Sequence, residues 1–167
     1  MTRLLLLRHA KAAPHSPDGD FARPLNPRGQ ADAARLGAFL ASRGIVPAAT
    51  LVSPAQRTRE TAALVLAALP GAPAPLFSDA LYNASVETLR AEIRAAPAGA
   101  ETLLVIGHNP AIGELAHALA GDGADKLPAG FPTCALAIFE AAPGAAKGRW
   151  SHRQRLVECV TPASSRR

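Results

Sequence analysis

Cysteine is scarce in this sequence, with only two residues, Cys134 and Cys159, among 167. Two cysteines are too few for a disulfide framework, and their spacing does not match that of a zinc site. Each lies in an apolar stretch, which favours a reduced thiol packed in the interior. The sequence therefore predicts neither a disulfide-stabilised fold nor a cysteine-bound metal.

Long hydrophobic runs are also missing. No apolar run approaches the roughly 20 residues that cross a bilayer. The run Leu4 to Leu7 is shorter than a signal-peptide core of about 7–15 residues, and no cleavage site follows it. We therefore expect a cytoplasmic protein that makes no membrane contact.

Aromatic residues make up only 4% of the chain, although its formal net charge is +5. The positive charge is concentrated in residues 126–167, which hold seven basic and two acidic side chains, whereas residues 1–125 hold eleven of each. Nucleic-acid binding by base stacking needs aromatic partners, so it is not predicted. Residues 126–167 could form a basic face for an acidic partner, but a solvated strand edge with a frayed tail is the preferred interpretation.

Hydrophobic residues at 49% and charged residues at 19% suit one globular domain, which we place at residues 1–160. Strand and helix patterns alternate along it, and a hairpin around Pro143-Gly144 closes it. The tail 161–167 is expected to be disordered. The predicted strands are 3–8, 49–52, 76–77, 102–106, 134–140 and 150–159, and the predicted helices are 27–43, 54–69, 86–95 and 110–119, with Ser85 as a cap and Gly44 as a stop. This order predicts a three-layer α/β/α fold with a mostly parallel sheet and an antiparallel edge.

Three predicted helices begin with the same kind of dipeptide: Asn26-Pro27, Ser53-Pro54 and Asn109-Pro110. Each pair places a good N-cap before a proline at the first helical position. Two of the three helices directly follow a strand. Their free backbone N–H groups should therefore point toward the carboxyl edge of the sheet, where an anion can bind.

Cationic and imidazole side chains follow three strands at that same edge. Arg8 and His9 end the first strand, Arg57 lies in the first turn of the helix after the second, and His108 follows the strand at 102–106. Ligands of open α/β sheets bind at this edge, and the arginine fork matches phosphate oxygens. The sequence therefore predicts a site for a doubly charged anion, with a histidine able to act as a nucleophile.

These segments resemble a known family. Leu7-Arg8-His9-Ala10, then Ser53-Pro54 leading to Arg57-Thr58 and Thr61, then Gly107-His108-Asn109-Pro110 are similar to the motifs of the histidine phosphatase superfamily, which is also called phosphoglycerate mutase-like. The Arg-His-Ala-Lys opening and the segment Arg23-Pro24-Leu25-Asn26-Pro27-Arg28-Gly29 resemble the short SixA-type phosphohistidine phosphatases. The resemblance covers residues 3 to 140 and implies the phosphoglycerate mutase-like fold.

The resemblance also assigns roles to residues. His9 would be the nucleophile that forms a phosphohistidine intermediate, while Arg8, Arg57 and His108 would hold the equatorial oxygens. Lys11 and Arg23 are further candidates for substrate binding. The pocket would stabilise the phosphoryl charge with cationic side chains, so we expect no metal and no cofactor. For attack, His9 must be neutral at one nitrogen while the other donates to a backbone carbonyl.

The general acid departs from the family pattern. Asn83 and Asn109 stand where relatives have an acidic residue, and Asp79 or Glu87 could substitute. A phosphohistidine has a better leaving group than an alkyl phosphate and needs less help from an acid. We therefore expect a metal-independent phosphatase acting on phosphohistidine in a protein. The alternatives are a small-molecule phosphomonoesterase of the same family and a catalytically weak phosphate-binding module.

Overall fold

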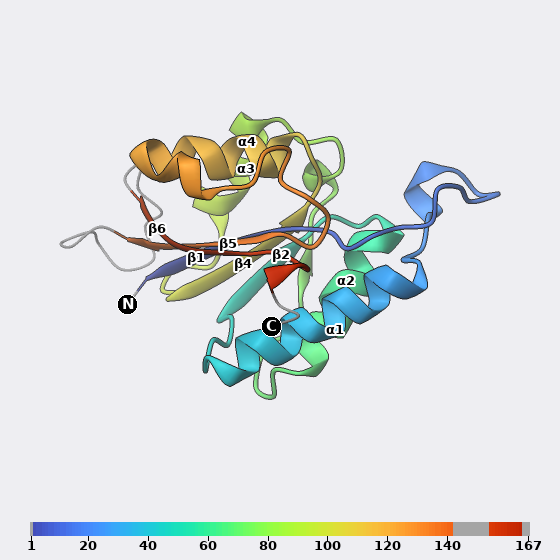
Figure 1. The fold of residues 1–167 in the computed structure, drawn as a ribbon, viewed down its shortest axis with the longest axis horizontal. Coiled ribbons are helices and arrows are strands. Elements are labelled where there is room, and N and C mark those ends of the chain that lie inside the picture. Colours follow the sequence, from blue (N-terminus) through green and yellow to red (C-terminus); the bar gives the residue numbers. More distant parts are fainter. Residues whose placement is uncertain (1, 142–153, 165–167) are drawn as a thin grey trace.

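A six-stranded sheet with helices on both faces forms the protein, as seen in a computed structural model that describes residues 2–141 and 154–164 (Figure 1). The strand order is β3-β2-β4-β1-β5-β6. The pairs β3–β2, β2–β4 and β4–β1 are parallel, whereas β1–β5 and β5–β6 are antiparallel. The elements are β1 (Arg3–Arg8), η1 (Asp20–Ala22), α1 (Pro27–Ser42), β2 (Ala49–Val52), α2 (Gln56–Ala67), β3 (Leu76–Phe77), η2 (Asp79–Leu81), α3 (Val86–Ala95), β4 (Thr102–Gly107), α4 (Ala111–Ala120), η3 (Gly121–Lys126), β5 (Leu136–Ala141) and β6 (Gln154–Val160). The predicted three-layer fold with an antiparallel edge is confirmed.

The apolar run in β1 is buried on both faces of the sheet. Leu4 and Leu6 pack in the cluster that includes residues of α3 and α4, whereas Leu5 and Leu7 pack in the cluster that includes residues of α1 and α2. This division follows from the two-residue period of a strand, which sends successive side chains to opposite faces. Each fully buried leucine stabilises the fold by about 1.5–3 kcal/mol relative to an exposed one. Because β1 has a helical layer on each side, its sequence is continuously apolar.

Figure 1 shows α3 and α4 covering one face of the sheet and α1 and α2 covering the other. Asn26 caps α1 as predicted, since its Oδ1 accepts from the Gly29 amide at 2.8 Å. Gly44, with φ +62°, follows the C-terminal end of α1, where the sequence predicted a stop. Ser85 caps α3 through the Thr88 amide, also as predicted. No helix in the described ranges, 2–141 and 154–164, is long and apolar enough to cross a membrane.

The C-terminal hairpin begins later than predicted, at Leu136 instead of Cys134. Cys134 has φ +61°, and its amide donates to the carbonyls of Arg8 and His9, so this residue closes a loop over the end of β1 and does not continue the strand.

Both cysteines are free; Cys134 is buried and Cys159 half-buried. The predicted turn at Pro143-Gly144 lies outside the described residues. In the segment predicted as a disordered tail, the Ser164 amide bonds to the Thr161 carbonyl, and residues 165–167 lie outside the description.

Candidate active site

The end of β1 delivers Arg8 and His9 to the carboxyl edge of the sheet, beside the end of β4. The His9 amide donates to the Gly107 carbonyl at 3.1 Å, and the Arg8 amide donates to the Ala135 carbonyl. Arg8 Nη1 donates to the Phe131 carbonyl at 3.0 Å. The two side chains are therefore held by backbone pairing on both sides of the strand.

The protonation of His9 follows from the hydrogen bond that one ring nitrogen makes to the backbone. Its Nδ1 lies 2.7 Å from the Ala10 carbonyl, which can only accept, so Nδ1 carries the proton and Nε2 keeps a lone pair. Burial lowers the His9 pKa to about 3 and outweighs the hydrogen bond to the Ala10 carbonyl, which raises it; the positive charges of Arg57 and Arg8 also lower it. The imidazole is therefore neutral at physiological pH, as the nucleophilic role requires.

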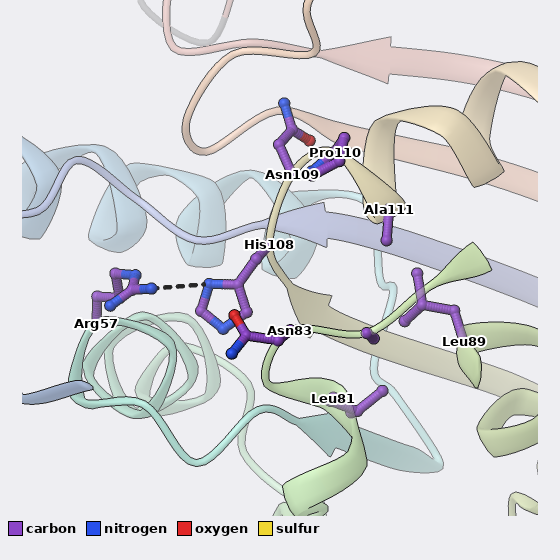
Figure 2. Close-up of a pocket in the computed structure, with 9 residues that line it drawn as sticks. Arg57, Leu81, Asn83, Leu89, His108, Asn109, Pro110 and Ala111 are labelled. Carbon is purple, nitrogen blue, oxygen red and sulfur yellow. Dashed lines mark hydrogen bonds between the residues drawn. The ribbon is translucent and has the colours of Figure 1, made fainter. Parts of the chain in front are cut away.

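Arg57 and His108 reach the same place from the ends of β2 and β4. Arg57 lies in the first turn of α2 with only 5% of its surface exposed. Its Nη2 lies 3.3 Å from His108 Nδ1, the contact drawn as a dashed line in Figure 2. Because a guanidinium can only donate, His108 Nδ1 accepts and Nε2 carries the proton, which it donates to Ser53 Oγ at 2.7 Å. Burial, aided by Arg57, lowers the His108 pKa to about 4.

The imidazole rings of His9 and His108 lie 5.3 Å apart. The structure thus brings together all four predicted central residues, Arg8, His9, Arg57 and His108. Arg8 Nε and Arg57 Nε are buried and have no hydrogen-bond partner among the described residues. The cluster therefore combines a neutral imidazole with two buried guanidinium groups.

Ser53 does not cap α2, contrary to prediction. The helix begins at Gln56, its N-cap is Ala55, and no side chain caps it. The Ser53 amide still donates to the Ile106 carbonyl of β4, so Ser53 extends the strand and its hydroxyl is used by His108. The predicted helix start at Pro54 is wrong for the same reason.

Asn109 does not cap α4 either, because its side chain bonds elsewhere. Its Nδ2 donates to the carbonyls of Gly130 at 2.8 Å and Phe131 at 3.0 Å, and the helix begins at Ala111. The Phe131 carbonyl is also the acceptor of Arg8 Nη1. Asn109 therefore helps to fix the loop segment that holds Arg8.

A cavity of about 310 Å³ opens beside Arg57 and His108 (Figure 2). It is lined by Arg57, Leu81, Asn83, Ala84, Leu89, His108, Asn109, Pro110 and Ala111. Asn83 and Asn109, which occupy the positions of the expected general acid, are both on its wall. Asp79 and Glu87 are exposed and are not among the lining residues. The described lining therefore contains no carboxylate.

Lys11 and Arg23 take different places from the central four. Lys11 is exposed, and its backbone carbonyl accepts from the Asn26 amide at 2.9 Å. Arg23 Nε bonds Asp20 Oδ1 at 2.9 Å, and its Nη1 donates to the Ala13 carbonyl. Arg23 thus anchors the loop between β1 and α1, while its role in binding substrate stays a prediction, as does that of Lys11.

Sequence reasoning missed Asp20 and Tyr82. Asp20 Oδ2 accepts from Arg57 Nη2 at 3.2 Å and from the Tyr82 hydroxyl at 2.7 Å. The edge of the Tyr82 ring packs on the His108 ring at 5.7 Å. The Tyr82 hydrogen bond, with help from Arg23 and Arg57, lowers the Asp20 pKa to about 2. The three-residue spacing of Asp20 and Arg23 could have indicated an ion pair from the sequence. Arg57 and Tyr82 could not be found in this way, because they are distant from Asp20 in sequence.

No group of three or more His, Cys, Asp or Glu residues that could hold a metal ion occurs within residues 2–141 and 154–164. Separately, the buried guanidinium groups of Arg8 and Arg57 beside His9 suit the binding of an anion. Such a site can bind a phosphoryl group and present an imidazole nitrogen to it.

Comparison with known proteins agrees with this geometry. Residues 4–79 match the model of the histidine phosphatase superfamily (branch 1). An uncharacterised protein of Mycobacterium leprae is 36% identical over 158 residues, which cover 87% of this chain and 91% of that protein.

Two solved structures have the same fold. One, assigned as a phosphohistidine phosphatase SixA from Agrobacterium tumefaciens, has a TM-score of 0.83 and 35% identity, covering 96% of this chain and 98% of that one. Another with the same assignment, from Nakamurella multipartitia, has a TM-score of 0.80 and 31% identity, covering 96% of each chain. The chain therefore belongs to the histidine phosphatase superfamily and is a phosphatase of its SixA-like group.

Proposed function

We propose that this phosphatase removes the phosphoryl group from phosphohistidine in a protein substrate, through a covalent intermediate on His9. The observation that carries the proposal is the bond from His9 Nδ1 to the Ala10 carbonyl, which leaves Nε2 free to attack. The neighbouring Arg8 and Arg57 supply the positive charge that a phosphoryl transition state needs.

The reaction has two displacements. In the first, His9 Nε2 attacks phosphorus, the P–N bond to the substrate imidazole breaks, and the leaving imidazole takes up a proton from solvent. In the second, water attacks phospho-His9, the bond to Nε2 breaks, and inorganic phosphate leaves; the attacking water gives a proton to solvent, and His9 returns to its neutral form. His108 donates from Nε2 and can hold a phosphoryl oxygen in place of Ser53.

The lining of the cavity favours a substrate with a good leaving group. Asn83 and Asn109 cannot donate a proton as an acid does, and a positioned acid typically contributes 10²–10⁴-fold to rate. An alkoxide leaving group would lose that factor, whereas an imidazole needs less assistance. This argument supports phosphohistidine over an alkyl phosphate.

A small-molecule phosphomonoester is the second candidate. The cavity of about 310 Å³ beside His108 is large enough for a small organic phosphate, which favours this alternative. The cytoplasmic location expected from the sequence stays a prediction under either candidate.

A substrate panel separates the two. We expect a phosphohistidine-bearing protein to be hydrolysed with a kcat/KM at least ~100-fold above those of sugar phosphates and nucleoside monophosphates, in line with the missing acid. The rates should be unchanged in EDTA, because arginines supply the positive charge. Preference for a small ester would support the second candidate, and loss of activity in EDTA would contradict the metal-independent mechanism.

A further inference from the structure

Asp20 connects three parts of the site that are far apart in sequence. It begins η1 in the loop between β1 and α1, and 55% of its side chain is exposed. Its carboxylate nevertheless contacts Arg23 in the same loop, Arg57 in α2 and Tyr82 after η2. An exposed carboxylate with three side-chain partners has a more specific role than a solvated surface charge.

Two of these contacts fix the plane of one guanidinium. Arg57 Nη1 donates to the Asp20 backbone carbonyl at 2.8 Å, and Arg57 Nη2 lies 3.2 Å from Asp20 Oδ2. Acceptors on two different nitrogens oppose rotation of the planar group. The same Nη2 lies 3.3 Å from His108 Nδ1, so the orientation that Asp20 imposes also sets the contact between Arg57 and His108.

The third contact places an aromatic ring against His108. The Tyr82 hydroxyl donates to Asp20 Oδ2 at 2.7 Å, and the Tyr82 ring meets the His108 ring edge-on at 5.7 Å. Phe21 packs against the other side of Tyr82, with ring centroids 5.1 Å apart. Asp20 therefore restrains His108 both through Arg57 and through Tyr82.

The charge of Asp20 has the opposite effect on substrate binding. A carboxylate 3.2 Å from Arg57 Nη2 cancels part of the positive charge that attracts a phosphoryl dianion. Tyr82, Arg23 and Arg57 keep its pKa near 2, so it stays ionised and has no proton to give at neutral pH. Asp20 can therefore favour the reaction only by orienting its partners.

We propose that Asp20 is a positioning residue that aligns Arg57 and Tyr82 around His108, so that it raises turnover while weakening the binding of the phosphoryl group. The inference rests on the proposed function, because it assigns a role within the same reaction. It distinguishes Asp20 from a general acid and from a residue that only stabilises the loop.

The test is Asp20→Asn, which keeps the size of the side chain and the backbone carbonyl but removes the charge. We expect kcat on the best substrate of the panel to fall about 10- to 100-fold, as for a misplaced catalytic group. The dissociation constant of inorganic phosphate should decrease, because the charge of Asp20 no longer offsets that of Arg57, and KM should not rise. Asp18→Asn, on the same loop with an exposed side chain, makes the same charge change and should leave kcat unchanged.

A double-mutant cycle shows whether Asp20 acts through Arg57. In the Arg57→Ala background, Asp20→Asn should cause little further loss of kcat, whereas independent roles would give multiplicative losses. Wild-type kcat in Asp20→Asn, or an affinity for inorganic phosphate that is unchanged or weaker, would overturn the inference. Asp20→Glu, which keeps the charge and moves the carboxylate, should also lose kcat and serves if Asp20→Asn does not fold. Absence of turnover in the wild-type protein would instead refute the proposed function itself.

Discussion

At the scale of the residue, the chemistry depends on the protonation of two buried histidines. His9 is neutral because it is buried beside positive charges, and the Ala10 carbonyl, which accepts from Nδ1, fixes the lone pair on Nε2. His108 is neutral because it is buried beside Arg57 and accepts at Nδ1. From the expected mechanism, the sequence predicted a neutral His9 with one nitrogen donating to a backbone carbonyl. It did not predict that His108 accepts at Nδ1, because the donor, Arg57, is 51 residues away in sequence.

The same protonation makes stability depend on pH. The folded-state pKa values of His9 and His108, about 3 and about 4, lie below the ordinary histidine value near 6.5. Below pH 6.5 the unfolded chain binds protons that the folded protein does not bind. The free energy of unfolding should therefore be fully retained above pH 7 and fall by about 1–3 kcal/mol between pH 7 and pH 5.

Urea unfolding at the two pH values measures this difference. The His9→Gln and His108→Gln variants should each show a smaller difference than the wild-type protein, because one of the two histidines no longer titrates. Equal pH dependence in all three proteins would show that neither histidine is held neutral by the fold.

At the scale of the element, the sequence predicted most strands and helices but only some of the polar side chains that cap helices. The strand at Ala49–Val52 and the cap at Asn26 are confirmed. Ser53 and Asn109 precede proline just as Asn26 does, yet they bond to His108 and to the loop at 130–131. A cap is a local signal, and these two side chains are used by partners that only the folded chain brings near.

Gly29 connects α1 to the segment that carries the nucleophile. A Cβ added at Gly29 would lie 2.1 Å from the Lys11 carbonyl oxygen, so helix and segment would have to separate. Gly29→Ala should therefore lower the free energy of unfolding by about 1–3 kcal/mol, as overpacking does. It should also reduce kcat about 10-fold or more, because Lys11 lies two residues after His9.

Gly37→Ala is the matched control on the same helix. Its Cβ would lie 2.7 Å from the Val65 carbonyl oxygen, in the contact between α1 and α2. Denaturant unfolding should show a loss of stability of the same kind, while kcat of the folded protein stays near that of the wild type. If Gly29→Ala had no larger effect on kcat than Gly37→Ala, the helix would not support the site.

At the scale of the whole molecule, the site exists because three strands end side by side. β2, β4 and β1 are neighbours in the sheet, and their carboxyl ends bring together residues about 50 positions apart (Figure 1). The sequence predicted this convergence because parallel strands share an edge. It did not predict Asp20 and Tyr82, because they lie on loops whose course is set by tertiary contacts.

In the proposed reaction, His9 carries the phosphoryl group during turnover. Rapid quenching of the protein during turnover of a phosphohistidine-bearing substrate, with analysis under alkaline and acid conditions, tests it most directly. We expect an alkali-stable, acid-labile phosphoryl group that peptide mapping assigns to His9. It should be absent in His9→Ala and present in His117→Ala, whose histidine lies on α4. Turnover by His9→Ala, or a phosphoryl group on another residue, would contradict a covalent intermediate on His9.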